Sequence, residues 1–119
     1  MKQISIALLF LLIYSTGKSQ SCKDLPTKFS SYRQAVNSIK GSKFILTDQL
    51  PDGKSSWIKS ANYYSCDGYN GYLIYRTEKG KEYIHEKVPI SVWKGFKTAN
   101  SSGSYYVHNI KGKYRLVPE

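Results

Sequence analysis

Residues 72–88 read YLIYRTEKGKEYIHEKV, and this stretch decides the fold. Two runs within it, 72–77 and 82–88, are rich in aromatic and β-branched residues, which are typical of β-strands. The four residues between the runs, EKGK, contain Gly80, which can adopt a positive φ in a tight turn at no steric cost. The stretch therefore predicts an antiparallel β-hairpin.

A third strand is expected before this hairpin and a helix after it. Residues 57–64 read WIKSANYY, and the Asp-Gly and Asn-Gly pairs that follow them are typical of a turn. Pro89 suits the start of a helix, where its missing N–H has no partner to lose. The apolar residues after it fall on one helical face, which we expect to pack on the sheet: Val92, Trp93, Phe96 and Ala99.

The C-terminal residues 105–110 (YYVHNI) and 114–117 (YRLV) are predicted as two final strands. The order β-β-β-α-β indicates an α+β domain over residues 55–117, in which a small antiparallel sheet carries one packed helix. Residues 21–54 form an N-terminal extension with a short helix. Its start is indicated by the capping-box spacing of Ser31 and Gln34, and its end by Gly41.

The first twenty residues have the layout of a secretory signal peptide. A basic start is followed by the apolar run ISIALLFLLIY at 4–14 and then by a small polar stretch. Eleven helical residues span roughly 16 Å, about half of the hydrocarbon core of a bilayer, so we expect no transmembrane anchor. The cleavage site stays open, as does lipidation of Cys22, because Ser19 stands where a lipobox carries an aliphatic residue. The mature chain is expected to be exported, to the periplasm or as a secreted protein.

Two cysteines, Cys22 and Cys66, belong to the exported part of the chain. An even number of cysteines in an exported protein predicts a disulfide. Closing a loop of about 45 residues would stabilise the fold by roughly 4 kcal/mol in the loop-entropy model. A reactive thiol or a metal ligand is the less favoured alternative, because neither cysteine has a CxxC partner or a histidine at ligand spacing.

Several short motifs occur in order from the predicted first strand of the domain to its end: Ser56-x-Ile58, Leu73-x-Tyr75, Gly80-x-x-Tyr83, Val88-Pro89, Ala99-x-Ser101-x-Gly103, Tyr105-Tyr106, Ile110-Lys111 and Tyr114. In these features the chain resembles the KTSC domain, a small module named from its presence at the C-terminus of some lysyl-tRNA synthetases. RNA binding has been suggested for that family, without established catalysis. His85 and Val107 depart from its pattern, in which a Tyr and an Asn are common, so any ligand contact at these positions is altered here.

Catalytic groups are few in this sequence. The chain has two histidines, and it lacks the G-x-S-x-G, H-E-x-x-H, P-loop and G-x-G-x-x-G motifs. Strand alternation places His85 on the solvated face, opposite Ile84 and Val88, and packs His108 beside Tyr106. We therefore predict a protein that is not an enzyme and has no cofactor and no bound metal.

Charge and aromatic content favour a binding role. The 119 residues carry a net charge of +10 and include 11 tyrosines, many of them interleaved with Lys and Arg on the predicted strands. Aromatic and basic side chains on a sheet can bind nucleic acid, which is the alternative function, although an exported protein seldom meets RNA. The preferred partner is a protein or an acidic component of the envelope. The predicted site is one sheet face bearing Lys59, Tyr75, Arg76, Tyr83 and His85.

Overall fold

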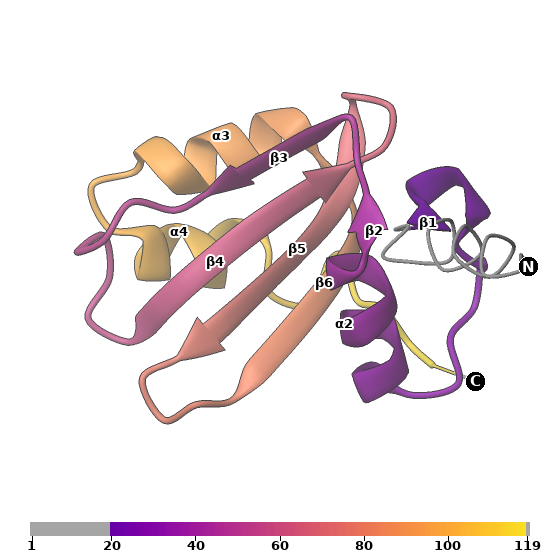
Figure 1. The fold of residues 1–119 in the computed structure, drawn as a ribbon. Helices are drawn as coiled ribbons and strands as arrows, with labels where there is room; N and C mark the ends of the chain where they lie inside the picture. Colours follow the sequence, from indigo (N-terminus) through magenta and orange to yellow (C-terminus); the bar gives the residue numbers. More distant parts are fainter. Residues whose placement is uncertain (1–19, 119) are drawn as a thin grey trace, which may run out of the picture.

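A four-stranded antiparallel sheet forms the centre of the structure, a computed structural model that describes residues 20–118 (Figure 1). Its strands lie side by side in the order β3 (Leu46–Gln49), β4 (Ile58–Ser65), β5 (Asn70–Thr77) and β6 (Glu82–Pro89). The predicted hairpin is formed by β5 and β6, and Gly80 in its turn has a φ of +87°. A separate parallel pair joins β1 (Gln20–Ser21) to β2 (Ser42–Lys43).

Helices cover both faces of the sheet. The helices α3 (Ile90–Thr98) and α4 (Ser102–Asn109) lie on one face, and α2 (Tyr32–Lys40) lies on the other (Figure 1). The larger core fills the space under α3 and α4, where the Tyr63 and Trp93 rings stack at 5.2 Å. The smaller core lies between α2 and the opposite face, around Ile39, Ile74 and Ile84. The α+β class is confirmed.

The N-terminal extension is built into this fold. The Ser31 hydroxyl accepts a hydrogen bond from the backbone N–H of Gln34 at 3.0 Å, so the predicted cap of α2 is confirmed. The Gln34 side chain accepts from the N–H of Ser30, one residue earlier than a standard capping box requires. The extension therefore supplies one edge strand of the sheet, β3, which pairs with β4, and the helix that covers its second face, α2.

The predicted disulfide between Cys22 and Cys66 is present, with the two Cα atoms 5.9 Å apart. It ties the short 3₁₀ helix Cys22–Asp24 to the loop between β4 and β5. The proposed signal peptide lies, apart from Gln20, outside the described residues. Within residues 20–118, the structure has no helix with the length and apolar character needed to cross a membrane.

The predicted strand 105–110 is wrong, because these residues belong mainly to the helix α4. The Ser101 hydroxyl caps this helix by accepting from the N–H of Ser104 at 3.1 Å. Tyr and Val favour strands, but the cap and the burial of Tyr106 against the sheet outweigh that preference. The predicted strand 114–117 is reduced to a single antiparallel bridge between Arg115 and His85.

Candidate functional site

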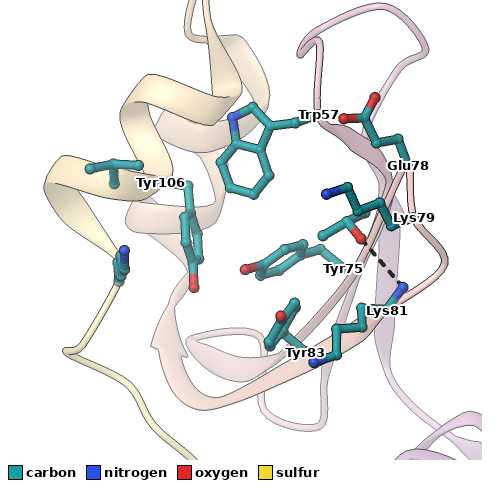
Figure 2. Close-up of a pocket in the computed structure, with 10 residues that line it drawn as sticks. Trp57, Tyr75, Glu78, Lys79, Lys81, Tyr83 and Tyr106 are labelled. Atoms are coloured by element: carbon teal, nitrogen blue, oxygen red, sulfur yellow. Dashed lines mark hydrogen bonds between the residues drawn. The ribbon is translucent and has the colours of Figure 1, made fainter.

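An aromatic cluster lies where α4 meets the sheet. Tyr75 is at its centre, with Tyr83 stacked on it at a ring distance of 5.2 Å and Tyr106 edge-on at 4.8 Å. Trp57 contacts the other side of Tyr75 at 6.0 Å, with the two rings nearly perpendicular. Figure 2 shows the rings of Trp57, Tyr75 and Tyr83 in succession, with Tyr106 beside them. The aromatic cluster therefore extends from Trp57, through Tyr75, to Tyr83.

Three parts of the fold bring these rings together. Tyr75 of β5 and Tyr83 of β6 are directly opposite each other in the strand register. Tyr106 projects from α4, and Trp57 comes from the residues just before β4. Gly103 allows Trp57 to approach α4, because a Cβ at this position would collide with the indole nitrogen. The cluster thus depends on close contact between the helix and the start of β4.

A groove passes over the cluster and consists of two adjoining hollows of about 550 and 650 Å³. The two hollows have four lining residues in common: Lys81, Tyr83, Tyr106 and Lys111. The first hollow extends to Trp57, and the second extends to His85 and Arg115. We refer to both hollows together as the groove.

The polar rim of the groove is mostly cationic. Its basic residues are Lys79, Lys81, Lys111 and Arg115, all exposed. None of these four forms an ion pair with another described residue, whereas Glu82, on the same rim, pairs with Lys40 at 2.7 Å. The Lys81 ammonium lies 6.0 Å from the centre of the Tyr83 ring, within range of a cation–π interaction. An anionic ligand would therefore meet unpaired positive charge.

The floor of the groove is electrically neutral. His85 is only 6% exposed, and this desolvation lowers the pKa of its imidazole, although the nearby Tyr114 carbonyl partly opposes the shift. Burial, followed by the hydrogen bond with Tyr106, raises the pKa of Tyr75. Burial also raises the pKa of Tyr106. At neutral pH the floor therefore presents uncharged rings and phenol groups beneath the cationic rim.

Comparison with known proteins identifies the domain. The family model of the KTSC domain matches residues 54–114, just over half of the chain. The chain belongs to the KTSC domain family. A crystal structure of a KTSC domain protein from Yersinia pestis is 28% identical in sequence, covering 60% of this chain and 99% of that chain with a TM-score of 0.49. A search among curated proteins gave no match.

The KTSC domain contains most of the groove. Its matched residues run from the turn before Trp57 to Tyr114, so they include all four residues common to the two hollows. Outside the match, Tyr32 of α2 and the C-terminal residues Arg115 and Leu116 complete the second hollow. The groove is thus a feature of the domain that its flanking segments extend.

The structure brings together three of the five predicted site residues. Tyr75, Tyr83 and His85 lie on the same face of the sheet, with both Tyr83 and His85 stacked against Tyr75. Arg76 points to the opposite face and lines a separate polar hollow with Ser60 and Asn62. Lys59 lies at a β-bulge and lines another hollow near Asp52 and Glu78. The predicted cations are therefore on other surfaces, and the groove draws its cations from elsewhere in the KTSC domain and its C-terminal tail.

The predicted exposures of the two histidines are wrong. Strand alternation predicts His85 on the solvated face, opposite Ile84 and Val88. Ile84 does lie on the opposite face, in the smaller core, but Val88 lies on the same face as His85. A β-bulge between these residues, with Lys87 at a φ of 56°, adds one residue to β6 and brings Val88 to the same face as His85. Since α4 covers that face, His85 is buried. His108 is exposed because it lies on a helix rather than on a strand.

Most residues of the groove lie outside the predicted site, among them Trp57, Lys81, Tyr106 and Lys111. Strand propensity predicts a strand at Tyr106, whereas this residue lies on the face of α4 that packs on the sheet. The spacing of Ser101 and Ser104 was the available signal, because a serine that caps a helix predicts helical rather than strand geometry for the tyrosines after it. Lys81 and Lys111 lie in turns, whose positions over the sheet depend on tertiary packing.

The tyrosines predicted to form an open nucleic-acid platform are mostly covered. Of the eight on the predicted strands, Tyr83 is the exposed one, at 41%. Tyr63, Tyr75 and Tyr106 are buried between the sheet and the helices α3 and α4. Stacking of successive bases on a sheet requires open aromatic faces. The face that the nucleic-acid hypothesis requires is therefore occupied by helices.

Proposed function

We propose that this KTSC domain protein is exported and acts without catalysis, by binding an acidic envelope component or an envelope protein in the groove. The observation that carries the proposal is the combination of four unpaired cations with a neutral aromatic floor. Aromatic surface contributes contact area and cations attract an acidic partner, which is the usual division of roles in a binding site. Nucleic acid is the alternative partner, which the covered sheet face disfavours.

The absence of catalysis is proposed on the surroundings of His85. This side chain is buried, and its Nε2 atom lies 3.1 Å from the Tyr106 hydroxyl. A general base must reach the proton of a bound substrate, and His85, although it borders the second hollow, is only 6% exposed and has its Nε2 atom engaged with Tyr106. Within residues 20–118, no group of three or more His, Cys, Asp or Glu side chains is placed to hold a metal ion.

Export is proposed on two features. The first twenty residues have the composition of a signal peptide, and the Cys22–Cys66 disulfide is compatible with an oxidising compartment. Intact mass measurement of the native protein, after fractionation of the source cells, tests this part. We expect loss of about the first twenty residues, no added lipid and a mass lower than that of the reduced chain by two hydrogen atoms. A full-length chain in the cytoplasmic fraction would contradict export.

Binding can be followed through Trp57. The chain has two tryptophans, and Trp93 is buried in the core, whereas Trp57 lines the groove. Quenching of tryptophan fluorescence by an acidic polymer therefore reports on the groove. We expect the double substitution Lys81→Gln/Lys111→Gln to weaken binding at least tenfold at low salt. The affinity should fall with increasing salt, as it does for ion-pairing interactions.

A matched control distinguishes binding in the groove from non-specific electrostatic binding of a polyanion to a basic protein. Lys59→Gln/Lys94→Gln removes the same charge from two exposed lysines that lie outside the lining of the groove. We expect this variant to bind as the wild type does within a factor of about two. Equal weakening in both double variants would mean that the net charge attracts the polymer. Absence of binding to any acidic polymer at low salt would refute the proposed function.

A further inference from the structure

We infer that the ligand of the groove is an acidic polysaccharide, whose sugar rings contact Trp57 and Tyr83 while its acidic groups meet the lysines of the rim. The inference rests on the proposed function and specifies the chemical class of its acidic partner. Three features of the groove lead to it: its extent over two hollows, the two aromatic rings that reach its surface and the one unpaired carboxylate on its rim.

The groove is suited to an extended ligand. Its two hollows meet at Tyr83 and Tyr106, with Trp57 at one end and Arg115 at the other. Cations lie in both hollows, because Lys81 and Lys111 are common to them. A ligand that uses the whole groove must therefore be a chain with repeated negative charges rather than one compact molecule.

Two aromatic rings reach the surface of the groove on either side of Tyr75, where one chain can contact both. Tyr75 lies between Trp57 and Tyr83, with ring distances of 6.0 and 5.2 Å to its two neighbours (Figure 2). Tyr75 itself is buried, so the outer two rings are the ones that reach the groove surface. Aromatic rings offer apolar contact area together with polar edges, which suits the apolar C–H faces and hydroxyl groups of sugars.

Glu78 distinguishes a sugar chain from other polyanions. It lines the first hollow beside Trp57, is exposed, and forms no ion pair with another described residue (Figure 2). A carboxylate accepts hydrogen bonds, and one that a ligand shields from water needs donors from that ligand. An acidic sugar carries several hydroxyl donors on each unit, whereas the side chains of polyglutamate carry none and each RNA unit has a single 2′-hydroxyl. A rim with four cations and one such acceptor therefore matches a polymer that carries both carboxylates and hydroxyls.

The test compares polymers of matched length by fluorescence quenching and calorimetry with the full mature chain in its disulfide form. The polymers are an oligogalacturonate, polyglutamate, single-stranded RNA and neutral dextran. We expect the oligogalacturonate to bind at least tenfold more tightly than polyglutamate at the same ionic strength. Dextran should bind weakly, because it lacks the negative charges that the lysines attract.

Two variants test the contacts themselves. Tyr83→Ala removes an exposed ring and should weaken oligogalacturonate binding at least tenfold, followed by calorimetry. The matched control Tyr69→Ala removes a tyrosine that is 74% exposed and lies outside the groove, and should leave the affinity unchanged. Glu78→Gln should reduce the preference for oligogalacturonate over polyglutamate, because the charge-assisted hydrogen bonds that Glu78 accepts from sugar hydroxyls are weakened.

The outcomes separate this inference from the proposed function. Polyglutamate could bind as tightly as oligogalacturonate, with the Lys81/Lys111 variant weakening the binding of both polymers. That result would support the proposed binding of an acidic partner and contradict its assignment as a polysaccharide. Tighter binding of RNA than of oligogalacturonate would overturn the inference in favour of the nucleic-acid alternative. An unchanged affinity in Tyr83→Ala would also overturn it. Binding to none of the polymers would refute both.

Discussion

The Nε2 atom of His85 lies 3.1 Å from the hydroxyl of Tyr106, and both side chains are buried between the sheet and α4. The other ring nitrogen, Nδ1, makes no hydrogen bond of good geometry within the described residues. A buried imidazole with one satisfied nitrogen is stable when it is neutral, because protonation would add an uncompensated charge. This pair therefore links the position of α4 to the protonation state of the His85 imidazole on β6.

The stability of the protein should depend on pH through His85. Burial lowers the pKa of His85 in the folded state, so the unfolded chain binds the proton first as the pH falls. Its contribution to stability is present above the ordinary histidine pKa of about 6.5 and is lost as the pH falls below that value. Denaturant titrations between pH 7.5 and 5.0 should show a loss of at most about 1.4 kcal/mol per pH unit for this one proton.

His85→Phe isolates this effect, because it keeps a ring in the cluster and removes the titrating group. We expect its free energy of unfolding to change less between pH 7.5 and 5.0 than that of the wild type. His108→Gln is the control, since His108 is exposed on α4. If His85→Phe keeps the full pH dependence, another group is responsible.

Much of the fold followed from local sequence signals. The hairpin of β5 and β6 follows from strand composition around a glycine turn, and α2 follows from the Ser31 cap. Even the disulfide followed from the cysteine count together with the expectation of export. The hairpin and α2 depend on residues close in sequence, and two cysteines can form only one intramolecular disulfide.

The position of the groove and the burial of its residues depend on tertiary packing, which local sequence patterns do not report. The β-bulge at Lys87 reversed the face of Val88, one of the two residues used to place His85, and a bulge leaves no reliable mark in strand composition. Strand alternation also assumes that one sheet face is wet, whereas here helices cover both faces. Lys81 comes from the β5–β6 turn and Lys111 from the turn after α4, and the packing of α4 on the sheet brings these two turns to the same groove.

Lys87 should be replaceable by glycine with a gain in stability. Its φ of 56° lies in the left-handed region, which costs a residue with a side chain roughly 1–2 kcal/mol. Its side chain is exposed, so little packing is lost. Lys87→Gly should raise the free energy of unfolding by about 1 kcal/mol, measured by denaturant titration.

Lys59→Gly is the matched control for that substitution. Lys59 is also an exposed lysine at a bulge in a strand, but it is not among the described residues with a positive φ. Glycine at this position gives no relief of strain and adds flexibility to the unfolded chain, so it should cost about 0.5–1 kcal/mol. A loss of stability in both variants would argue against strain at Lys87.

Gly103→Ala should destabilise the protein, although alanine favours helices. A Cβ at position 103 would collide with the Trp57 indole nitrogen and approach the Ser55 hydroxyl. Overpacking of this kind costs about 1–3 kcal/mol, which exceeds the gain of roughly 1 kcal/mol in helix propensity. The variant should also show altered Trp57 fluorescence and weaker ligand binding. Ser104→Ala, at an exposed position of the same helix, should change stability by less than about 0.5 kcal/mol.

Removal of the disulfide should lower stability and leave the groove intact. Cys22 and Cys66 are 44 residues apart, and the loop-entropy model assigns such a crosslink about 4 kcal/mol. The double substitution Cys22→Ser/Cys66→Ser should therefore have a lower melting temperature than the oxidised wild type.

The hollow beside the disulfide and the two hollows of the groove have no lining residue in common. Ligand affinity measured well below the melting temperature should therefore match that of the wild type within a factor of about two. Reductant should lower the melting temperature of the wild type to that of the double variant, whose own melting temperature should not respond to reductant. An unchanged melt of the wild type with reductant would contradict a stabilising disulfide.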